Sequence, residues 1–379
     1  MKGLKIALIA VLATLAIGLL VVMGGMITGR FHFYNFFWGE NWGMSEDGTV
    51  YGNTTLQADT EVPGNDIRAV EVNFSKTGCD ILFLPSPDGT LRVKEYYNAE
   101  VAEDKKARIK VDGNTLVVQQ MLYPGVQSGI RRISGYVEIY LPDTTYASLK
   151  QLEASTTSGN ISLPKWEAVD NMEMEKLDFS TTSGDIDVDL LQSVKAQLSS
   201  TSGNLTVGRM QGDLTMSATS GDMEVLEIDG RLQMDGTSGN QTAGIVRGNL
   251  HMESTSGDVK AGTVTGDVEM DTVSGWQQVG GMTGKGSFGS TSGDITVSLD
   301  EMTGDITCDS TSGDVDITVP RDSSFSLSIE STSGSVKTSF DDQLSFNKRR
   351  TSAEGNIGTS LQYRVKVETT SGSIKVYEK

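Results

Sequence analysis

The sequence predicts an all-β fold: a β-solenoid of single-stranded coils, preceded by one transmembrane helix. Each coil has 18 residues and consists of two nine-residue strand-turn units. Glycine recurs at every ninth residue from Gly203 to Gly293, and Asp or Asn usually follows it. Apolar residues then occupy the third and fifth positions of the unit, which is the period of a short strand. A fixed period of this kind is typical of repeat architectures.

The nine-residue units alternate in kind, which makes the coil 18 residues long rather than nine. Every second unit ends in Thr-Ser before its glycine, as at Thr219-Ser220 and Thr237-Ser238. The other units carry an apolar residue at the eighth position, as at Ile228 and Val246. A unit this small cannot bury its own apolar side chains. We therefore expect the coils to stack, with each strand paired to its equivalent in the next coil.

Residues 1–30 are predicted to be an N-terminal transmembrane anchor. The stretch from Leu4 to Ile27 is nearly all apolar and is long enough to span a bilayer as a helix. Lys2 and Lys5 at its start predict a cytoplasmic N-terminus and an extracytoplasmic solenoid, in a single-pass protein of the cell membrane. A cleaved signal peptide is the alternative, but the segment 23–26 is a poor cleavage site.

Three further regions are expected after the anchor. Residues 31–66 are predicted to be an aromatic juxtamembrane segment followed by a polar linker. Residues 67–148 have strand patterns without the nine-residue register, and should form an N-terminal β cap over the open edge of the first coil. The solenoid repeats and a C-terminal cap should occupy residues 149–379. Within them, the segment from Pro164 to Lys176 exceeds the coil length and is expected to bulge out as a loop.

The formal net charge of −19 in 379 residues disfavours nucleic acid and anionic lipid surfaces as partners. No nucleic-acid partner is therefore expected. Only two cysteines are present, Cys79 and Cys308, and they predict no disulfide framework.

A column of carboxylates is the main candidate for an ion site. In units that end in Thr-Ser the sixth position faces outward, so stacking should bring Asp235, Glu253 and Asp271 together at strand spacing. Such a column could hold calcium. However, the Gly-Gly-x-Gly-x-Asp pattern of calcium-binding solenoids is absent, and hydrogen bonding in the turn explains the Asp or Asn after each glycine. We therefore expect no metal, no other cofactor, and folding that does not need calcium.

Trp276 is the candidate contact residue. It replaces the usual Asp or Asn in a coil crowded with glycine, and an exposed tryptophan there could contact a partner. A local packing irregularity explains the same residue equally well. His251 has an outward position and is expected to be a solvated surface residue. No cluster of acids and bases suited to catalysis is recognisable, so no catalytic residue is assigned and an enzyme is not expected.

The repeated Thr-Ser-Gly-Asp/Asn-apolar units, the N-terminal anchor and the last strand, from Thr370 to Val376, resemble the bacterial "putative adhesin" family of β-strand-repeat domains. The resemblance covers about Ile67 to Lys379. It implies the solenoid fold and brings no catalytic residues with it. Some members of this family occur beside envelope-stress regulatory systems.

We accordingly expect a membrane-anchored extracytoplasmic β-solenoid that acts as a binding, adhesive or scaffolding module at the bacterial cell envelope. Its partner would be an envelope protein or a surface glycan. An accessory or regulatory protein of an envelope-stress system is the alternative, and a carbohydrate-active enzyme is the third possibility.

Overall fold

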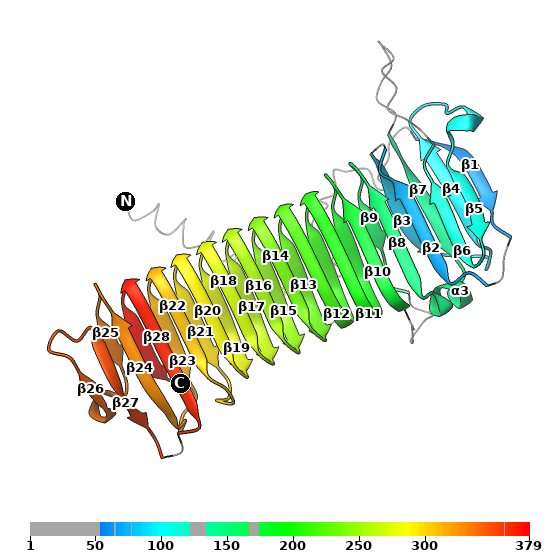
Figure 1. Cartoon of the computed structure of the whole chain (residues 1–379). Coiled ribbons are helices and arrows are strands. Elements are labelled where there is room, and N and C mark those ends of the chain that lie inside the picture. Colours follow the sequence, from blue (N-terminus) through cyan, green and yellow to red (C-terminus); the bar gives the residue numbers. More distant parts are fainter. Residues whose placement is uncertain (1–53, 64–65, 77, 122–133, 167–173, 360) are drawn as a thin grey trace, which may run out of the picture. The chain divides into compact units, whose positions relative to one another are not determined.

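The computed structural model describes residues 54–379, apart from 64–65, 77, 122–133, 167–173 and 360. The predicted anchor at residues 1–30 and the aromatic segment after it lie outside the described residues. Within the described part of the chain, no helix is both long and apolar enough to cross a membrane. Residues 55–379 form one unit, an elongated β-solenoid whose strands stack side by side (Figure 1).

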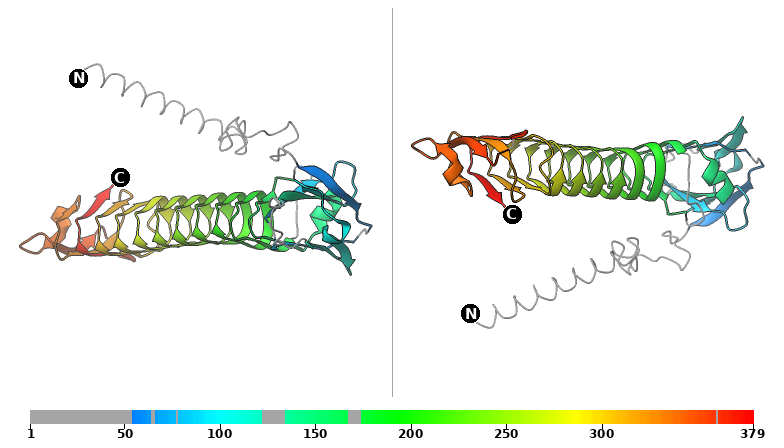
Figure 2. Two further views of the ribbon diagram at one scale, coloured as in Figure 1. Left: turned by 90° about the horizontal axis from the view of Figure 1, so that it is seen from above. Right: turned by 90° about the horizontal axis from the view of Figure 1, so that it is seen from below.

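Two rows of parallel strands form the two faces of this unit, as the views from above and below show (Figure 2). The row that leads into the Thr-Ser corners is called the Thr-Ser face here, and the other row is called the glycine face. The Thr-Ser face contains β8 (Gln151–Thr156), β10 (Met174–Thr181), the second halves of β11 (Ile186–Ser202) and β12 (Leu205–Ser220), β14 (Leu232–Ser238), β16 (Leu250–Ser256), β18 (Val268–Ser274), β20 (Gly286–Ser292) and β22 (Ile306–Ser312). The glycine face contains β9 (Ile161–Leu163), the first halves of β11 and β12, β13 (Met223–Asp229), β15 (Gln241–Arg247), β17 (Val259–Thr265), β19 (Gln277–Thr283), β21 (Ile295–Leu299) and β23 (Val315–Val319).

The strand register confirms the 18-residue coil. Leu214 pairs with Leu232, and Leu232 pairs with Leu250 in the next coil. The third and fifth positions point into a thin core between the two faces, as the period-2 pattern predicts. The methionines at these inward positions and at the eighth position are all buried, namely Met210, Met216, Met223, Met234, Met252, Met270 and Met282.

Glycine is required at the corners because successive coils approach each other closely there. Gly239 has a φ of +127°, and a Cβ on it would lie 2.2 Å from the backbone oxygen of Gly221. The Asp or Asn that follows each glycine forms hydrogen bonds between coils rather than within the turn. For example, Asp222 Oδ1 accepts a hydrogen bond from the Asn240 backbone N–H at 2.7 Å. These bonds form a ladder along the corner.

The N-terminal end does not follow chain order. It contains β1 (Thr55–Glu61), β2 (Ala69–Phe74), β3 (Cys79–Pro85), β4 (Arg92–Tyr97), β5 (Arg108–Asp112), β6 (Thr115–Gln119), β7 (Gly135–Leu141) and the short helix α3 (Asp143–Ser148). Strands β2 and β3 form a coil that lies between β6/β7 and β8/β9, with parallel pairing on both sides. Strands β1, β4 and β5 add antiparallel pairs at this end.

Two local predictions about this end need correction. Strand β1 lies within residues 31–66, where the sequence predicts a linker; it is a polar strand that pairs with β4 through its backbone. Trp166 lies in the segment that was expected to bulge out, yet it is buried. Its ring stacks on Tyr146 with centroids 3.9 Å apart, and its Nε1 donates a hydrogen bond to Asp143. The start of that loop is therefore packed against α3.

The C-terminal end repeats the same arrangement. It contains β24 (Phe325–Ser331), β25 (Val336–Thr338), β26 (Leu344–Phe346), β27 (Ser352–Ile357), β28 (Tyr363–Ser371) and β29 (Ile374–Glu378). The last two strands of the chain, β28 and β29, lie between β22/β23 and β24/β25 (Figure 1). Strands β26 and β27 add antiparallel pairs. At both ends, therefore, the outermost place in the stack is not taken by the first or last coil of the chain. Strands β6 and β7 cover the coil of β2 and β3, and strands β24 and β25 cover the coil of β28 and β29.

Candidate functional site

A groove runs along the Thr-Ser face beside its corner. Its volume is about 640 Å³, and it crosses the coils from β11 to β20. One wall is the outward sixth position of each unit, and the other is the eighth position, which carries threonine in most coils. The sixth-position residues are Ser217, Asp235, Glu253, Asp271 and Gly289. The seventh position between the walls points inward and has only small residues, including Ala218, Gly236 and Ser254, which leaves the surface hollow.

The same columns continue at the C-terminal end, where a second hollow of about 400 Å³ lies. It is lined by Asp309 of β22, Glu368 of β28 and Glu330 of β24. Asp309 pairs with Glu368, and Glu368 pairs with Glu330, because β28 lies between the other two strands. Sequence reasoning missed Glu330 and Glu368, since the exchange of strand order at this end cannot be read from the repeat.

The predicted carboxylate column is present. Asp235 pairs directly with Glu253, and Glu253 pairs directly with Asp271. Burial and the nearby carboxylates of Glu269 and Glu253 raise the pKa of Asp271, although His251 opposes this shift. At the far end, burial and the Glu368 carboxylate raise the pKa of Asp309. The raised pKa values indicate that burial, with a smaller contribution from neighbouring carboxylates, makes Asp271 and Asp309 costly to ionise.

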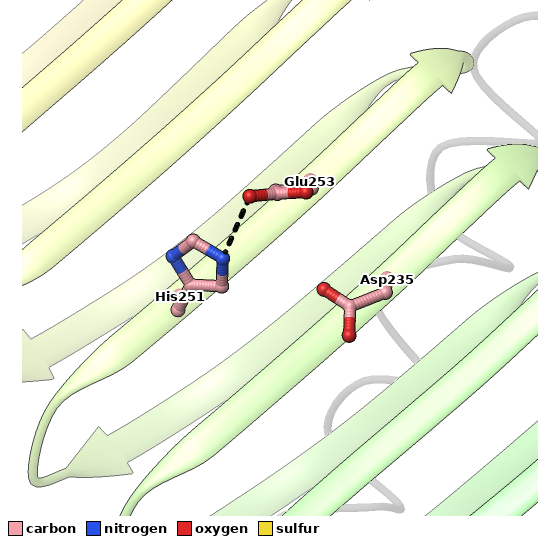
Figure 3. Close-up of side chains that lie close together, drawn as sticks. All are labelled: Asp235, His251 and Glu253. Carbon is pink, nitrogen blue, oxygen red and sulfur yellow. Dashed lines mark hydrogen bonds and ion pairs between the residues drawn. The ribbon is translucent and has the colours of Figure 1, made fainter.

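His251 lies at the surface, as expected, and contacts two carboxylates beside the column (Figure 3). Its Nε2 lies 3.1 Å from Glu253 Oε1, and its Nδ1 lies 3.2 Å from Glu269 Oε2. Asp235, His251 and Glu253 each offer one potential ligand atom, and these three atoms lie within 4.8 Å of one another. The sequence period could have predicted these contacts. Glu253 is two residues after His251, on the same side of the strand, and Glu269 is 18 residues, or one coil, after His251.

Trp276 is exposed, with 40% of its surface accessible, and Val273 of the same corner is 51% exposed. Val273 lines the groove in place of threonine. The Trp276 backbone N–H donates a hydrogen bond to Asp258 Oδ1 at 3.1 Å, as the equivalent residues of neighbouring coils do. The indole has no oxygen to offer Asp294 in the following coil, so Trp276 interrupts the corner ladder. This coil therefore presents two apolar side chains where its neighbours present polar ones.

The groove is lined by hydroxyls and carboxylates at regular strand spacing, and the His251 imidazole lies beside two of these carboxylates. In several coils the hydroxyl at the seventh position already donates a hydrogen bond to the backbone. For example, Ser290 Oγ donates to the Gly293 backbone oxygen. The structure brings together the predicted residues Asp235, Glu253 and Asp271, and it adds His251, Glu330 and Glu368 to the acidic columns.

Solved structures align with most of the chain at low identity. A "putative adhesin" from Parabacteroides merdae is 12% identical over 86% of this chain and 96% of that chain, with a TM-score of 0.31. A "putative lipid binding protein" from Parabacteroides distasonis is 12% identical over 86% and 97%, with a TM-score of 0.32. A "putative cell adhesion protein" from Clostridium sporogenes is 11% identical over 86% and 100%, with a TM-score of 0.19.

The chain matches no curated protein. A family model does match it: the model described as Toastrack DUF4097 aligns twice, with residues 71–261 and with residues 207–377. The two alignments together span nearly the whole solenoid, including both ends where the strand order is exchanged. The protein therefore belongs to the Toastrack DUF4097 family.

Proposed function

We propose that this protein is a non-catalytic binding module, adhesive or scaffolding in character, whose partner lies along the groove of the Thr-Ser face. The observation that carries this proposal is the column of carboxylates at the sixth position. The core needs nothing from that position, because the residues that fill it are at the third and fifth positions. Seven adjacent coils nevertheless place six carboxylates in one row, interrupted once by Gly289: Asp235, Glu253, Asp271, Asp309, Glu368 and Glu330.

The periodicity of the groove fits an extended partner. Its hydroxyls and carboxylates repeat at about 4.8 Å, the spacing of neighbouring strands. A row of carboxylates attracts positive charge, and it steers basic partners toward the groove. We propose an envelope protein with a basic extended segment as the partner, with a surface glycan as the competing outcome of the test.

The place of action follows from the predicted anchor at Leu4–Ile27. We propose that the protein is held in the cell membrane by this segment, with the solenoid on the extracytoplasmic side of a bacterial envelope. Protease added to intact cells should then remove the solenoid. A solenoid that is protected from protease would contradict this topology, and a mature N-terminus beyond Ile27 would contradict the anchor.

Binding can be tested on the full-length chain purified in detergent, with a fluorescent decalysine peptide and a fluorescent chito-oligosaccharide as probes. The double variant Asp235→Asn/Asp271→Asn removes two charges from the groove. The matched control Asp187→Asn/Glu224→Gln removes two charges from the glycine face. We expect decalysine affinity to fall about tenfold in the first variant and to change little in the second.

The two probes separate the outcomes. Equal losses in both double variants would show that only the net charge attracts the peptide, and would overturn a groove site. Binding of the glycan probe, but not of decalysine, would replace a basic segment by a surface glycan as the partner.

A further inference from the structure

The cluster of Asp235, His251 and Glu253 has the donors of a metal centre. From these residues we propose that the protein binds one transition-metal ion of the Zn²⁺ class between β14 and β16. This proposal is independent of the partner proposed above. His251 is the one histidine in residues 54–379, and it lies beside two carboxylates that stack in adjacent strands. Imidazole with carboxylates selects zinc and its neighbours rather than calcium or magnesium, which prefer oxygen ligands alone.

The distances are compatible with a shared ion after small side-chain movements. Ligand atoms lie about 2.0–2.2 Å from Zn²⁺, so tetrahedral neighbours are roughly 3.4 Å apart. His251 Nε2 and Glu253 Oε1 are already 3.1 Å apart, and all three candidate atoms lie within 4.8 Å of one another. Glu253 is exposed and Asp235 is half-buried, so rotation of their side chains can bring the carboxylates closer. The backbone that carries them is fixed by the strand pairing.

Residues outside the three ligands hold them in orientation. Glu269 Oε2 lies 3.2 Å from His251 Nδ1, on the ring nitrogen opposite to the proposed ligand atom. Nδ1–H can donate a hydrogen bond to Glu269, which leaves Nε2 free to bind a cation. On the other side, Gln233 Nε2 donates a hydrogen bond to Asp235 Oδ2 at 2.9 Å. Carboxylate–histidine pairs of this kind are the usual outer support of metal ligands.

A separate observation also indicates a ligand in this part of the groove. Ser254 follows Glu253 in β16, lines the groove and is only 5% exposed. Its Oγ has no hydrogen-bond partner, and neither has that of the equivalent Ser310, whereas Thr272 and Ser290 donate to backbone oxygens of their own corners. A buried hydroxyl without a partner commonly marks the place of a water or ion.

The experiment uses the full-length chain, stripped of metal and titrated with Co²⁺ by visible absorption and with Zn²⁺ by calorimetry. We expect one ion per chain and the absorption bands of Co²⁺ bound by nitrogen and oxygen ligands. Affinity should fall at least about tenfold in both His251→Gln and Asp235→Asn. The matched control Asp309→Asn, which removes a carboxylate from the same column three coils away from Glu253, should keep the affinity of the unchanged chain.

Circular dichroism of each metal-free variant checks that the solenoid is folded. If one of the two ligand variants does not fold, the other still tests the site. The proposal is overturned if no ion binds, or if several ions bind with affinities that His251→Gln does not change. The second result would show that the acidic surface attracts cations without a defined centre. Competition by excess calcium that displaces Co²⁺ completely would also contradict a histidine-containing site.

Discussion

The two faces of the solenoid share one core but differ in what they present to solvent. On the Thr-Ser face the sixth position carries Asp235, Glu253 and Asp271, and no lysine or arginine accompanies them at the sixth or fourth positions of those coils. On the glycine face the same position carries Gly208, Gly244 and Gly262, and the neighbouring Glu227 forms ion pairs with Arg209 and Arg247.

The reasons for the two patterns are different in kind. On the glycine face, a Cβ at Gly244 would lie 2.3 Å from the backbone oxygen of Leu226, so close approach of the coils favours glycine there. On the Thr-Ser face the packing of the core does not require a carboxylate at the sixth position. Burial, together with the charges of Glu269 and Glu253, instead raises the pKa of Asp271 and makes its carboxylate costly to ionise. One face is therefore shaped by folding, whereas the acidic column of the other is best explained by binding.

The largest expected loss of stability comes from placing a charge in the core, and it tests whether the two faces share that core. Val225 on the glycine face and Val268 on the Thr-Ser face are 1% and 2% exposed. Replacing either by Asp would bury an unpaired charge, and should lower the free energy of unfolding by about 4 kcal/mol or more. Urea unfolding followed by circular dichroism measures this loss. Because each coil contacts only its neighbours, the damage should start locally and spread along the stack.

The control for this prediction is the outward neighbour in each strand. Glu224→Gln and Glu269→Gln should change stability by no more than about 0.5 kcal/mol. A loss at these outward positions as large as at the valines would mean that the register is wrong, since a slip of one residue exchanges the two sides of a strand.

The sequence was sufficient to predict the middle of the solenoid, because one physical rule repeats there. Glycine at every corner and apolar residues at the third and fifth positions define the coil length and the register, and Leu214 pairs with Leu232 as expected. The ends could not be predicted in this way. The placement of β28 between β22 and β24 depends on long-range packing that leaves no periodic signal. Strand β1 was missed because its residues are mostly polar and exposed.

The candidate site was predicted in part. The column of Asp235, Glu253 and Asp271 follows from the period alone, since equivalent positions of adjacent coils must stack. The contacts of His251 with Glu253 and Glu269 were not predicted, because they join residues of one strand and of two adjacent coils. The hollow beside the column depends on small residues such as Gly236 and Ser254 at the seventh position, and its depth is a matter of packing that the pattern does not reveal.

A smaller effect concerns a carboxylate on the glycine face. Burial, together with the nearby carboxylates of Asp185 and Asp189, raises the pKa of Asp187 to about 6, against an opposing hydrogen bond from Thr206. The folded protein therefore holds this proton more tightly than the unfolded chain does. The stabilising contribution of the protonated side chain is complete below about pH 4 and is lost as the pH rises through 6.

Asp187→Asn cannot ionise, so it should raise the free energy of unfolding by about 1–2 kcal/mol at pH 8, after allowance for solvent screening. The gain should shrink to nothing near pH 4. Urea unfolding across this pH range measures it, and Asp229→Asn, an exposed carboxylate of the same face, controls for the loss of one charge. A gain that does not depend on pH would show that ionisation of Asp187 is not its cause.

The corner ladder provides a still smaller test, at the coil where Trp276 interrupts it. Asparagine at this position could accept a hydrogen bond from the Asp294 backbone N–H, as Asn240 accepts one from Asp258. Trp276→Asn should therefore be more stable than Trp276→Ala by about 0.5–1.5 kcal/mol, the usual net contribution of a hydrogen bond. Both variants lose the same indole, so thermal melts of the pair isolate the ladder. Equal stability of the two would show that the ladder bonds contribute nothing measurable.

Calcium should have the smallest effect of all on the melting temperature. This result would show that the acidic column is not a calcium site on which folding depends. The carboxylates of the Thr-Ser face are held at strand spacing by core packing and corner glycines, so the fold does not need an ion to bring them together. A ligand that binds only the folded state raises the melting temperature in proportion to its affinity. Melts with chelator and with millimolar calcium should therefore agree within about 1 °C. A rise of many degrees would show that calcium occupies the column of Asp235, Glu253 and Asp271, and that both faces are shaped by folding after all.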